Sequence, residues 1–234
     1  IASGTRLLAS ASASDFATPG SYQVAVTQLA QQQKLGSFTQ ASAATPAGVA
    51  GSFTVNGATV TVLAIDTLSD IRDKINAVNT GTSRSGVSAS VVTIAPGQSR
   101  LILSSTQAGE TGMTLADTTG TALQSLGFLT AATTFDPAAV LVAGRSAQFS
   151  VDGIEFTGTS NVVSSAIEGV TLTLTSAEVG AATTVTVSRS ASDAQKAMQA
   201  FVDAYNAVGD FITQQQTAPK AGQAISPLFG DNIL

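Results

Sequence analysis

Apolar residues in the C-terminal part of the chain recur at alternating steps of four and three residues. They are Ala194, Met198, Phe201, Tyr205, Val208 and Ile212. This heptad spacing lets one α-helix pack along another, so we predict a helix over 190–216 with a helix-packing interface on this seam. Ser190 and Asp193 have the spacing of a capping box at its start, and Pro219 lies just beyond its end.

Two arrangements would cover this apolar seam. The helix could pack on the chain's own sheets, or on a helix from another part of a longer protein. No other stretch of comparable length has the helical period, and the chain opens at Ile1 without a methionine. We therefore expect a fragment whose parent protein supplies the missing helix.

Elsewhere the apolar positions mostly alternate with polar ones, which is the period of half-buried β-strands. Residues 9–14 alternate small side chains and suit an edge strand, and 29–35 could be a short helix or a continued strand. The other predicted strands lie at 22–26, 53–55, 60–62, 86–92, 100–105, 149–151, 154–156, 170–174 and 184–188.

Two stretches repeat the same order of elements. In the first, a hairpin turns at Asn56-Gly57, and a helix over 68–78 follows after Thr67 as its cap. In the second, the hairpin turns at Asp152-Gly153, and apolar positions in 161–167 predict another short helix. A strand pair closes each stretch, so we predict two related β-β-α-β-β units.

The segment 106–143 between these units completes the first unit and leads back out. Its apolar anchors are Leu115, Leu123, Leu126 and Phe128. We therefore predict an α+β chain, mostly β, with two β-rich domains, one inserted in the other, each with a short helix, plus a C-terminal helical stem. The predicted boundaries are 1–47 with 144–189 for the outer domain, 48–143 for the inserted domain and 190–234 for a partial helical leg.

Composition restricts the classes of function. Hydrophobic residues make up 44% of the chain and charged residues 11%, which suits packed cores rather than disorder. The net charge is −5 with only ten Lys and Arg, so a basic footprint for nucleic acid is missing. No apolar run approaches the ~20 residues of a membrane span. Cys and His are absent, which removes disulfides, thiolate chemistry and the commonest metal ligand.

The polar residues suggest no reaction. The acids lie scattered at Asp70, Asp73, Asp136, Glu155 and Glu178. None of the lysines Lys34, Lys74, Lys196 and Lys220 lies in a Ser-Lys motif, and the segment 109–112 lacks the lysine of a phosphate loop. We therefore expect no enzyme, no cofactor and no metal, and a structural or interaction protein instead.

Five stretches of the sequence resemble the bacterial flagellar filament caps, the hook-associated protein 2 family. The stretch 67–76, TLSDIRDKIN, resembles the motif named for its Ile-Asn pair, here Ile75-Asn76, which flagellin and hook-associated proteins share. The other four stretches are 11–35, 146–174, 201–206 and 228–231.

This resemblance implies a secreted, extracellular protein at the tip of the bacterial flagellum. Cap subunits form a homo-oligomeric ring that retains flagellin and promotes its ordered polymerisation, with flagellin and an export chaperone as partners and no membrane insertion. Terminal coiled-coil regions, absent from this sequence, would cover the apolar seam. Export in an unfolded state would also account for a chain without cysteine.

Two alternatives stay open at this point. One is another flagellar axial protein of the flagellin or hook–filament junction type, which long terminal helices in the full gene would favour. The other is a surface adhesin that binds glycan or mucin, which binding to a glycan array would favour.

Overall fold

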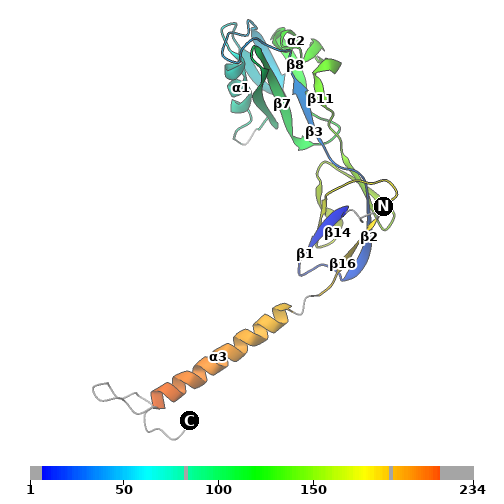
Figure 1. Cartoon of the computed structure of the whole chain (residues 1–234), viewed down its shortest axis with the longest axis vertical. Helices are drawn as coiled ribbons and strands as arrows, with labels where there is room; N and C mark the ends of the chain where they lie inside the picture. The colour runs from blue at the N-terminus through cyan, green and yellow to red at the C-terminus, as the bar shows by residue number, and fades with distance from the viewer. Residues whose placement is uncertain (1–6, 82–83, 190–191, 217–234) are drawn as a thin grey trace, which may run out of the picture. The chain divides into compact units, whose positions relative to one another are not determined.

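A computed structural model describes residues 7–81, 84–189 and 192–216 of the chain (Figure 1). Contacts divide the chain into two compact units, Ile1–Val187 and Ser188–Leu234. The first unit consists mostly of β-strands, with short helices, and contains two hydrophobic cores. The mostly β fold class predicted from the sequence is confirmed.

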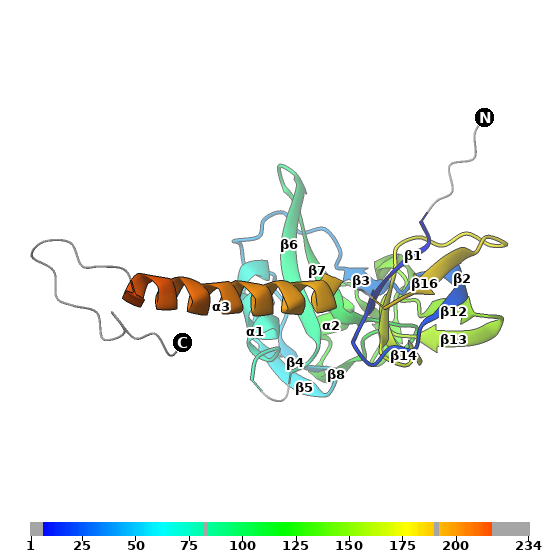
Figure 2. The same cartoon turned by 90° about the horizontal axis from the view of Figure 1, so that it is seen from below.

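The first core is built from the middle of the chain. A four-stranded sheet has the order β11-β3-β7-β6, a three-stranded sheet has the order β5-β4-β8, and β9 and β10 form a small pair. The long hairpin of β6 and β7 is seen in Figure 2. The elements are β3 (Gln32–Gly36), β4 (Gly51–Val55), β5 (Ala58–Val62), α1 (Leu68–Ala77), β6 (Val87–Ala95), β7 (Gln98–Ala108), β8 (Leu115–Gly120), α2 (Ala122–Ser125), β9 (Leu129–Ala131), β10 (Thr134–Phe135), η1 (Pro137–Ala139) and β11 (Val140–Val142).

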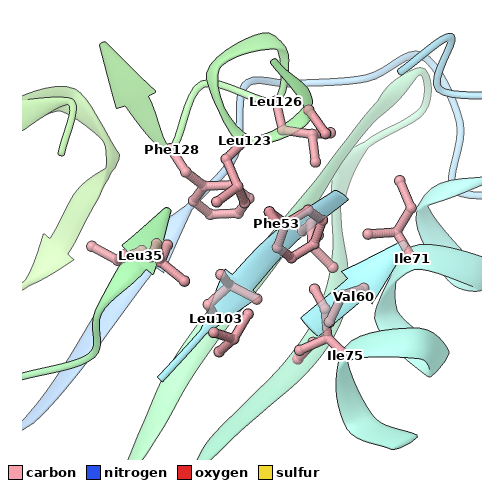
Figure 3. Packing of buried hydrophobic residues seen from close by; sticks show 14 of the residues in the cluster. Leu35, Phe53, Val60, Ile71, Ile75, Leu103, Leu123, Leu126 and Phe128 are labelled. Atoms are coloured by element: carbon pink, nitrogen blue, oxygen red, sulfur yellow. The ribbon is translucent and has the colours of Figure 1, made fainter. Parts of the chain in front are cut away.

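Aromatic and branched aliphatic side chains from these sheets and α1 fill the first core (Figure 3). Phe53 on β4 and Phe128 before β9 are its largest fully buried side chains. Ile71 and Ile75 reach it from one face of α1, as their spacing of four residues requires. The predicted anchors of the connecting segment are all buried in this core: Leu115, Leu123, Leu126 and Phe128.

The second core combines both ends of the first unit. One sheet has the order β1-β15-β14 and the other the order β13-β12-β2-β16, so the N-terminal strands pair only with strands that come after residue 146. Phe149 stacks on Phe156 with 5.4 Å between ring centroids. The elements are β1 (Ala9–Ala13), β2 (Gly20–Gln28), β12 (Ala147–Val151), β13 (Ile154–Gly158), β14 (Val162–Ile167), β15 (Val170–Leu174) and β16 (Thr183–Val187).

Two hairpins show that the cores share a local design. At Asn56-Gly57 the φ angles are +47° and +83°, and at Asp152-Gly153 they are +49° and +83°, which is the type I′ turn that the sequence predicts. The Asn56 N–H donates to Thr114 O at 2.9 Å, and the Thr114 N–H donates to Asn56 Oδ1 at 2.7 Å. Asp152 makes the same pair of bonds with Gln23, at 2.9 and 2.8 Å. This correspondence supports the predicted relation between the two units.

The prediction of a second short helix over 161–167 is wrong. These residues form strand β14, which pairs with β15 in antiparallel register. The β-branched pair Val162 and Val163 favours a strand, and a segment of this length is too short to form a helix without support. Helix α1, which belongs to the first of the two repeated β-β-α-β-β stretches, therefore has no counterpart in the second stretch. The ambiguous stretch 29–35 is resolved as well, because it leads into strand β3.

The domain boundaries stay predictions. The pairing of strand β3 concerns the predicted boundary at residue 47. The prediction assigns residues up to 47 to the outer domain. Strand β3 pairs instead with β7 and β11, and its Leu35 is fully buried in the first core. The chain therefore passes from the second core to the first before β3 begins.

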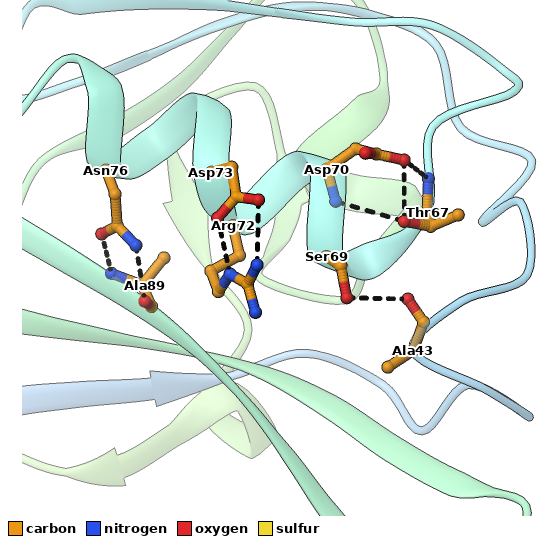
Figure 4. A network of polar contacts seen from close by, with 8 residues as sticks. All are labelled: Ala43, Thr67, Ser69, Asp70, Arg72, Asp73, Asn76 and Ala89. Atoms are coloured by element: carbon orange, nitrogen blue, oxygen red, sulfur yellow. Dashed lines mark hydrogen bonds and ion pairs between the residues drawn. The ribbon is translucent and has the colours of Figure 1, made fainter.

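Side-chain hydrogen bonds fix both ends of helix α1 (Figure 4). At its start Thr67 and Asp70 form a capping box, in which the Asp70 carboxylate accepts from the backbone N–H of Thr67 at 2.9 Å and from its hydroxyl. Near its end, the Asn76 carboxamide accepts from the Ala89 N–H at 2.8 Å and donates to the Ala89 carbonyl at 2.9 Å. The helix is thereby attached to β6 through backbone groups.

Two phenylalanines in the first unit provide a test of the core assignment. Phe53 is fully buried, whereas Phe16 is 87% exposed. We expect Phe53→Ala to lower the free energy of unfolding by about 3–5 kcal/mol, because it removes a buried ring and leaves a cavity. Phe16→Ala should change it by no more than about 0.5 kcal/mol. Urea unfolding followed by circular dichroism measures both, and equal effects would contradict the packing.

The capping box predicts a pH dependence. Hydrogen bonds from the Thr67 backbone N–H and hydroxyl hold the pKa of Asp70 below its ordinary value of 3.8. A carboxyl whose pKa is lowered by folding stabilises the folded chain when the pH is above the pKa of the unfolded state. This stabilisation disappears as the pH falls through the pKa of the folded state.

We therefore expect Asp70→Asn to unfold at a lower temperature than the parent chain near pH 7, and the difference to shrink as the pH falls below 3.8 and through the folded-state pKa of Asp70. Thermal unfolding of both proteins across this range measures it. A difference that stays constant down to the lowest pH would contradict the role assigned to the carboxylate.

Candidate functional site: the apolar face of the C-terminal helix

The second unit contains one long helix within the described residues, α3 (Ser192–Gln216). The sequence predicts this helix, and the prediction is confirmed over 192–216. Its predicted cap Ser190 and the following Pro219 lie outside the described residues. At 25 residues, α3 is about seven turns long and has room for a continuous packing face.

Large apolar side chains are exposed along one side of α3. Met198, Phe201 and Tyr205 are each 72% exposed, and Val208 is 59% exposed. Ile212 continues the seam and is half-buried, while the side chain of Ala194 lies outside the described residues. Val202 and Phe211 broaden this apolar face and are 46% and 57% exposed. These exposed apolar side chains make the face a candidate interaction surface.

The opposite side of α3 is polar. By the 3.6-residue period, Gln199, Asp203, Asn206 and Asp210 follow one another along that side. Gln199 Nε2 donates to Asp203 Oδ1 at 2.9 Å, one turn further on. The helix is therefore amphipathic, with a hydrated side and a side suited to packing against another apolar surface.

The candidate chemical residues do not come together into a reactive site. Asp70 and Asp73 lie on α1, Asp136 caps η1, and Glu155 and Glu178 are exposed on a strand and in a loop of the second core. Among residues 7–81, 84–189 and 192–216, no group of three or more acidic side chains is placed to hold a metal ion.

The lysines likewise have separate positions. Lys74 forms an ion pair with Asp66, Lys34 is exposed on β3, and Lys196 lies on α3, whereas Lys220 is outside the described residues. No helix in the described part of the chain is long and apolar enough to cross a membrane.

Two family models match the chain. The model for the flagellar hook-associated protein 2 C-terminus matches residues 144–234, and the model for the flagellin hook IN motif matches residues 47–107. The second match contains the hairpin at Asn56-Gly57, helix α1 and the strands β6 and β7, including Ile75-Asn76.

Curated relatives are also named flagellar hook-associated protein 2. The B-type flagellar hook-associated protein 2 of Pseudomonas aeruginosa is 33% identical over 238 residues, which cover 94% of this chain and 49% of the relative. The flagellar hook-associated protein 2 of Salmonella typhimurium is 31% identical over 170 residues, covering 70% of this chain and 35% of the relative. The chain thus spans about half the length, or less, of the curated relatives it matches.

Solved structures agree in fold. The D1-D2-D3 domains of the flagellar cap protein FliD from Escherichia coli superpose with a TM-score of 0.73 at 30% identity, covering 90% of this chain and 72% of that one. FliD (HAP2) from Pseudomonas aeruginosa PAO1 superposes with a TM-score of 0.69 at 27% identity, covering 93% of this chain and 100% of that one. The similarity therefore covers nearly the whole chain in both sequence and fold.

Proposed function

Because the chain belongs to the flagellar hook-associated protein 2 family, we propose that its parent protein caps the distal end of the bacterial flagellar filament. The observation that carries this proposal is the 33% identity to a hook-associated protein 2 across 94% of the chain. The similarity to the E. coli flagellar cap protein at a TM-score of 0.73 supports it independently, through the fold.

In this role the protein acts by assembly and not by a chemical reaction. Copies of the parent protein form a ring at the filament tip, outside the cell, where the ring retains flagellin and promotes its ordered polymerisation. An export chaperone accompanies the chain before secretion. A closed ring of identical subunits needs a contact that joins two different surfaces of the same molecule.

The apolar face of α3 serves as a helix-packing interface in this proposal. Its occupant is a helical segment of the parent protein, and the chain spans about half of relatives such as the P. aeruginosa protein. Support comes from the apolar side chains exposed along one side of the helix, from Met198 to Phe211. Burying one such side chain contributes about 1.5–3 kcal/mol, so a few of them are enough to hold a helical leg together.

The names of the relatives favour a cap over a flagellin or a hook–filament junction protein. Glycan or mucin binding stays a separate prediction that a glycan array would test.

The cap function predicts the phenotype of a deletion strain. Without the parent gene, we expect flagellin monomers in the culture medium and no filaments on the cells, because nothing retains subunits at the tip. Electron microscopy of the cells and immunoblotting of the medium measure both outcomes, with the complemented strain as the control. Normal filaments in the deletion strain would rule out the proposal.

The helix-packing interface predicts different effects for two neighbouring substitutions in the full-length protein. Phe201→Asp should lower the stability of the helical leg by several kcal/mol, because it buries an unpaired charge. Asp203→Ala lies on the polar side and should change stability by no more than about 0.5 kcal/mol. Thermal unfolding followed by the helix signal in circular dichroism compares the two, and equal midpoints would count against the assigned face.

A further inference from the structure

The two passages of the chain between the cores lie side by side as one antiparallel ribbon. Each step of three residues along the first passage matches a step of three residues back along the second. The pairs are Gln28 with Gln148, Gln31 with Arg145, and Lys34 with Val142. The three pairs thus share one offset across the crossing, and the register shifts at either end of it, between Gln148 and Phe149 and between Val140 and Val142.

The middle of this ribbon is held by direct backbone bonds. The Gln31 N–H donates to Arg145 O at 2.8 Å, and the Arg145 N–H donates to Gln31 O at 3.0 Å. One step toward the second core, Gln28 Nε2 donates to the Ser146 carbonyl at 2.7 Å. A reciprocal pair of this kind is the repeating unit of an antiparallel ladder, and here it forms a single bridge between the strands of the two cores.

Asn161 completes the ribbon on its other side. Since the backbone groups of Gln31 point toward Arg145, those of the preceding Ala30 point away from it. The Asn161 carboxamide meets both of them: Oδ1 accepts from the Ala30 N–H at 2.7 Å, and Nδ2 donates to the Ala30 carbonyl at 3.0 Å. The Asn161 carbonyl also accepts from the Leu174 N–H at 2.8 Å, which anchors it beside β15.

The end of strand β7 rests against the same point. The Gln31 carbonyl accepts a second bond, from the Gly109 N–H at 3.3 Å, and Ala108 packs against the second core. Gly144 allows this close approach, because a Cβ at that position would lie 2.3 Å from the Gly109 carbonyl oxygen. Residues from both cores therefore meet at the ribbon.

We propose that this ribbon couples the two cores mechanically, so that they move as one body, and that Asn161 is its positioning residue. A force or contact at one core is then transmitted to the other instead of being absorbed at a hinge. The inference rests only on the contacts within the first unit, so it stands or fails independently of the cap function.

Asn76 provides a matched control for Asn161. Its carboxamide makes the same pair of bonds with Ala89, at 2.8 and 2.9 Å. Ala89 lies on β6 within the first core, whereas Ala30 belongs to the second core and directly precedes Gln31 at the crossing. Losing either carboxamide removes two hydrogen bonds of the same kind to a backbone. Only the loss of Asn161 should change how the cores are held together.

The test measures the spread of distances between the cores. Because the chain has no cysteine, Thr59→Cys on β5 and Thr184→Cys on β16 introduce two exposed labelling positions. One spin label then lies on a strand of the first core and the other on a strand of the second core. Double electron–electron resonance should give one narrow distance distribution for the parent chain and a clearly broader one for Asn161→Ala. Asn76→Ala should keep the parent width.

Amide hydrogen exchange gives a second readout. In Asn161→Ala we expect the amides of Ala30, Gln31 and Arg145 to exchange about tenfold faster, as the loss of a hydrogen bond implies, while amides in the centre of both cores keep their rates. Gly144→Ala should produce the same pattern by steric conflict, and it replaces Asn161→Ala if that variant does not fold.

Three results would overturn the coupling. One is a parent distribution already as broad as that of the variants. Another is an unchanged width in both Asn161→Ala and Gly144→Ala. The third is equal broadening in Asn76→Ala. That result would show that general loosening of the fold, and not the loss of the Asn161 bonds to the ribbon, sets the width of the distance distribution.

Discussion

The fold depends on satisfying backbone N–H and C=O groups at places where no neighbouring strand is available. Two carboxamides do this in the same way, Asn76 at Ala89 and Asn161 at Ala30. At Gln23 the Asp152 carboxylate accepts from the backbone N–H, and the backbone N–H of Asp152 donates to the carbonyl. Unpaired buried backbone groups cost about as much as a lost hydrogen bond each, and unpaired strand edges invite association with other chains. With only 11% charged residues, the chain has few charged side chains with which to protect such edges. In this chain, short polar side chains therefore pair with otherwise unpaired backbone groups and so protect strand edges, which in many other β-proteins are protected by lysines.

This constraint also explains how an insertion can leave both cores intact. The first core is built from residues between Leu35 and Ala139, and the second from residues on either side of that segment. Each core buries its own apolar side chains, and Ala108 at the end of β7 packs against the second core. What the two share is the paired backbone of the crossing, where the bonds between Gln31 and Arg145 join them.

The sequence predicted those elements whose signals are local. The I′ turns at Asn56-Gly57 and Asp152-Gly153, the Thr67 cap and the long helix all follow from residue types within a few positions of one another. The prediction failed over 161–167, where apolar spacing resembled a helix although the β-branched residues and the pairing with β15 favour a strand. It also could not identify the ribbon, because the partner of Gln31 is Arg145, far away in the sequence. The apolar face of α3 was recognisable from its heptad period, because that signal lies within one continuous segment.

The pairing of Gln31 with Arg145 has a consequence for the evolution of the chain. The inserted segment enters and leaves at two neighbouring residues that are joined by hydrogen bonds. A compact β-sandwich therefore remains on one side of this point, with a gap that a tight turn could close. Such an arrangement makes the middle of the chain an exchangeable module. The strand orders of the second core, β1-β15-β14 and β13-β12-β2-β16, include no strand from the inserted segment.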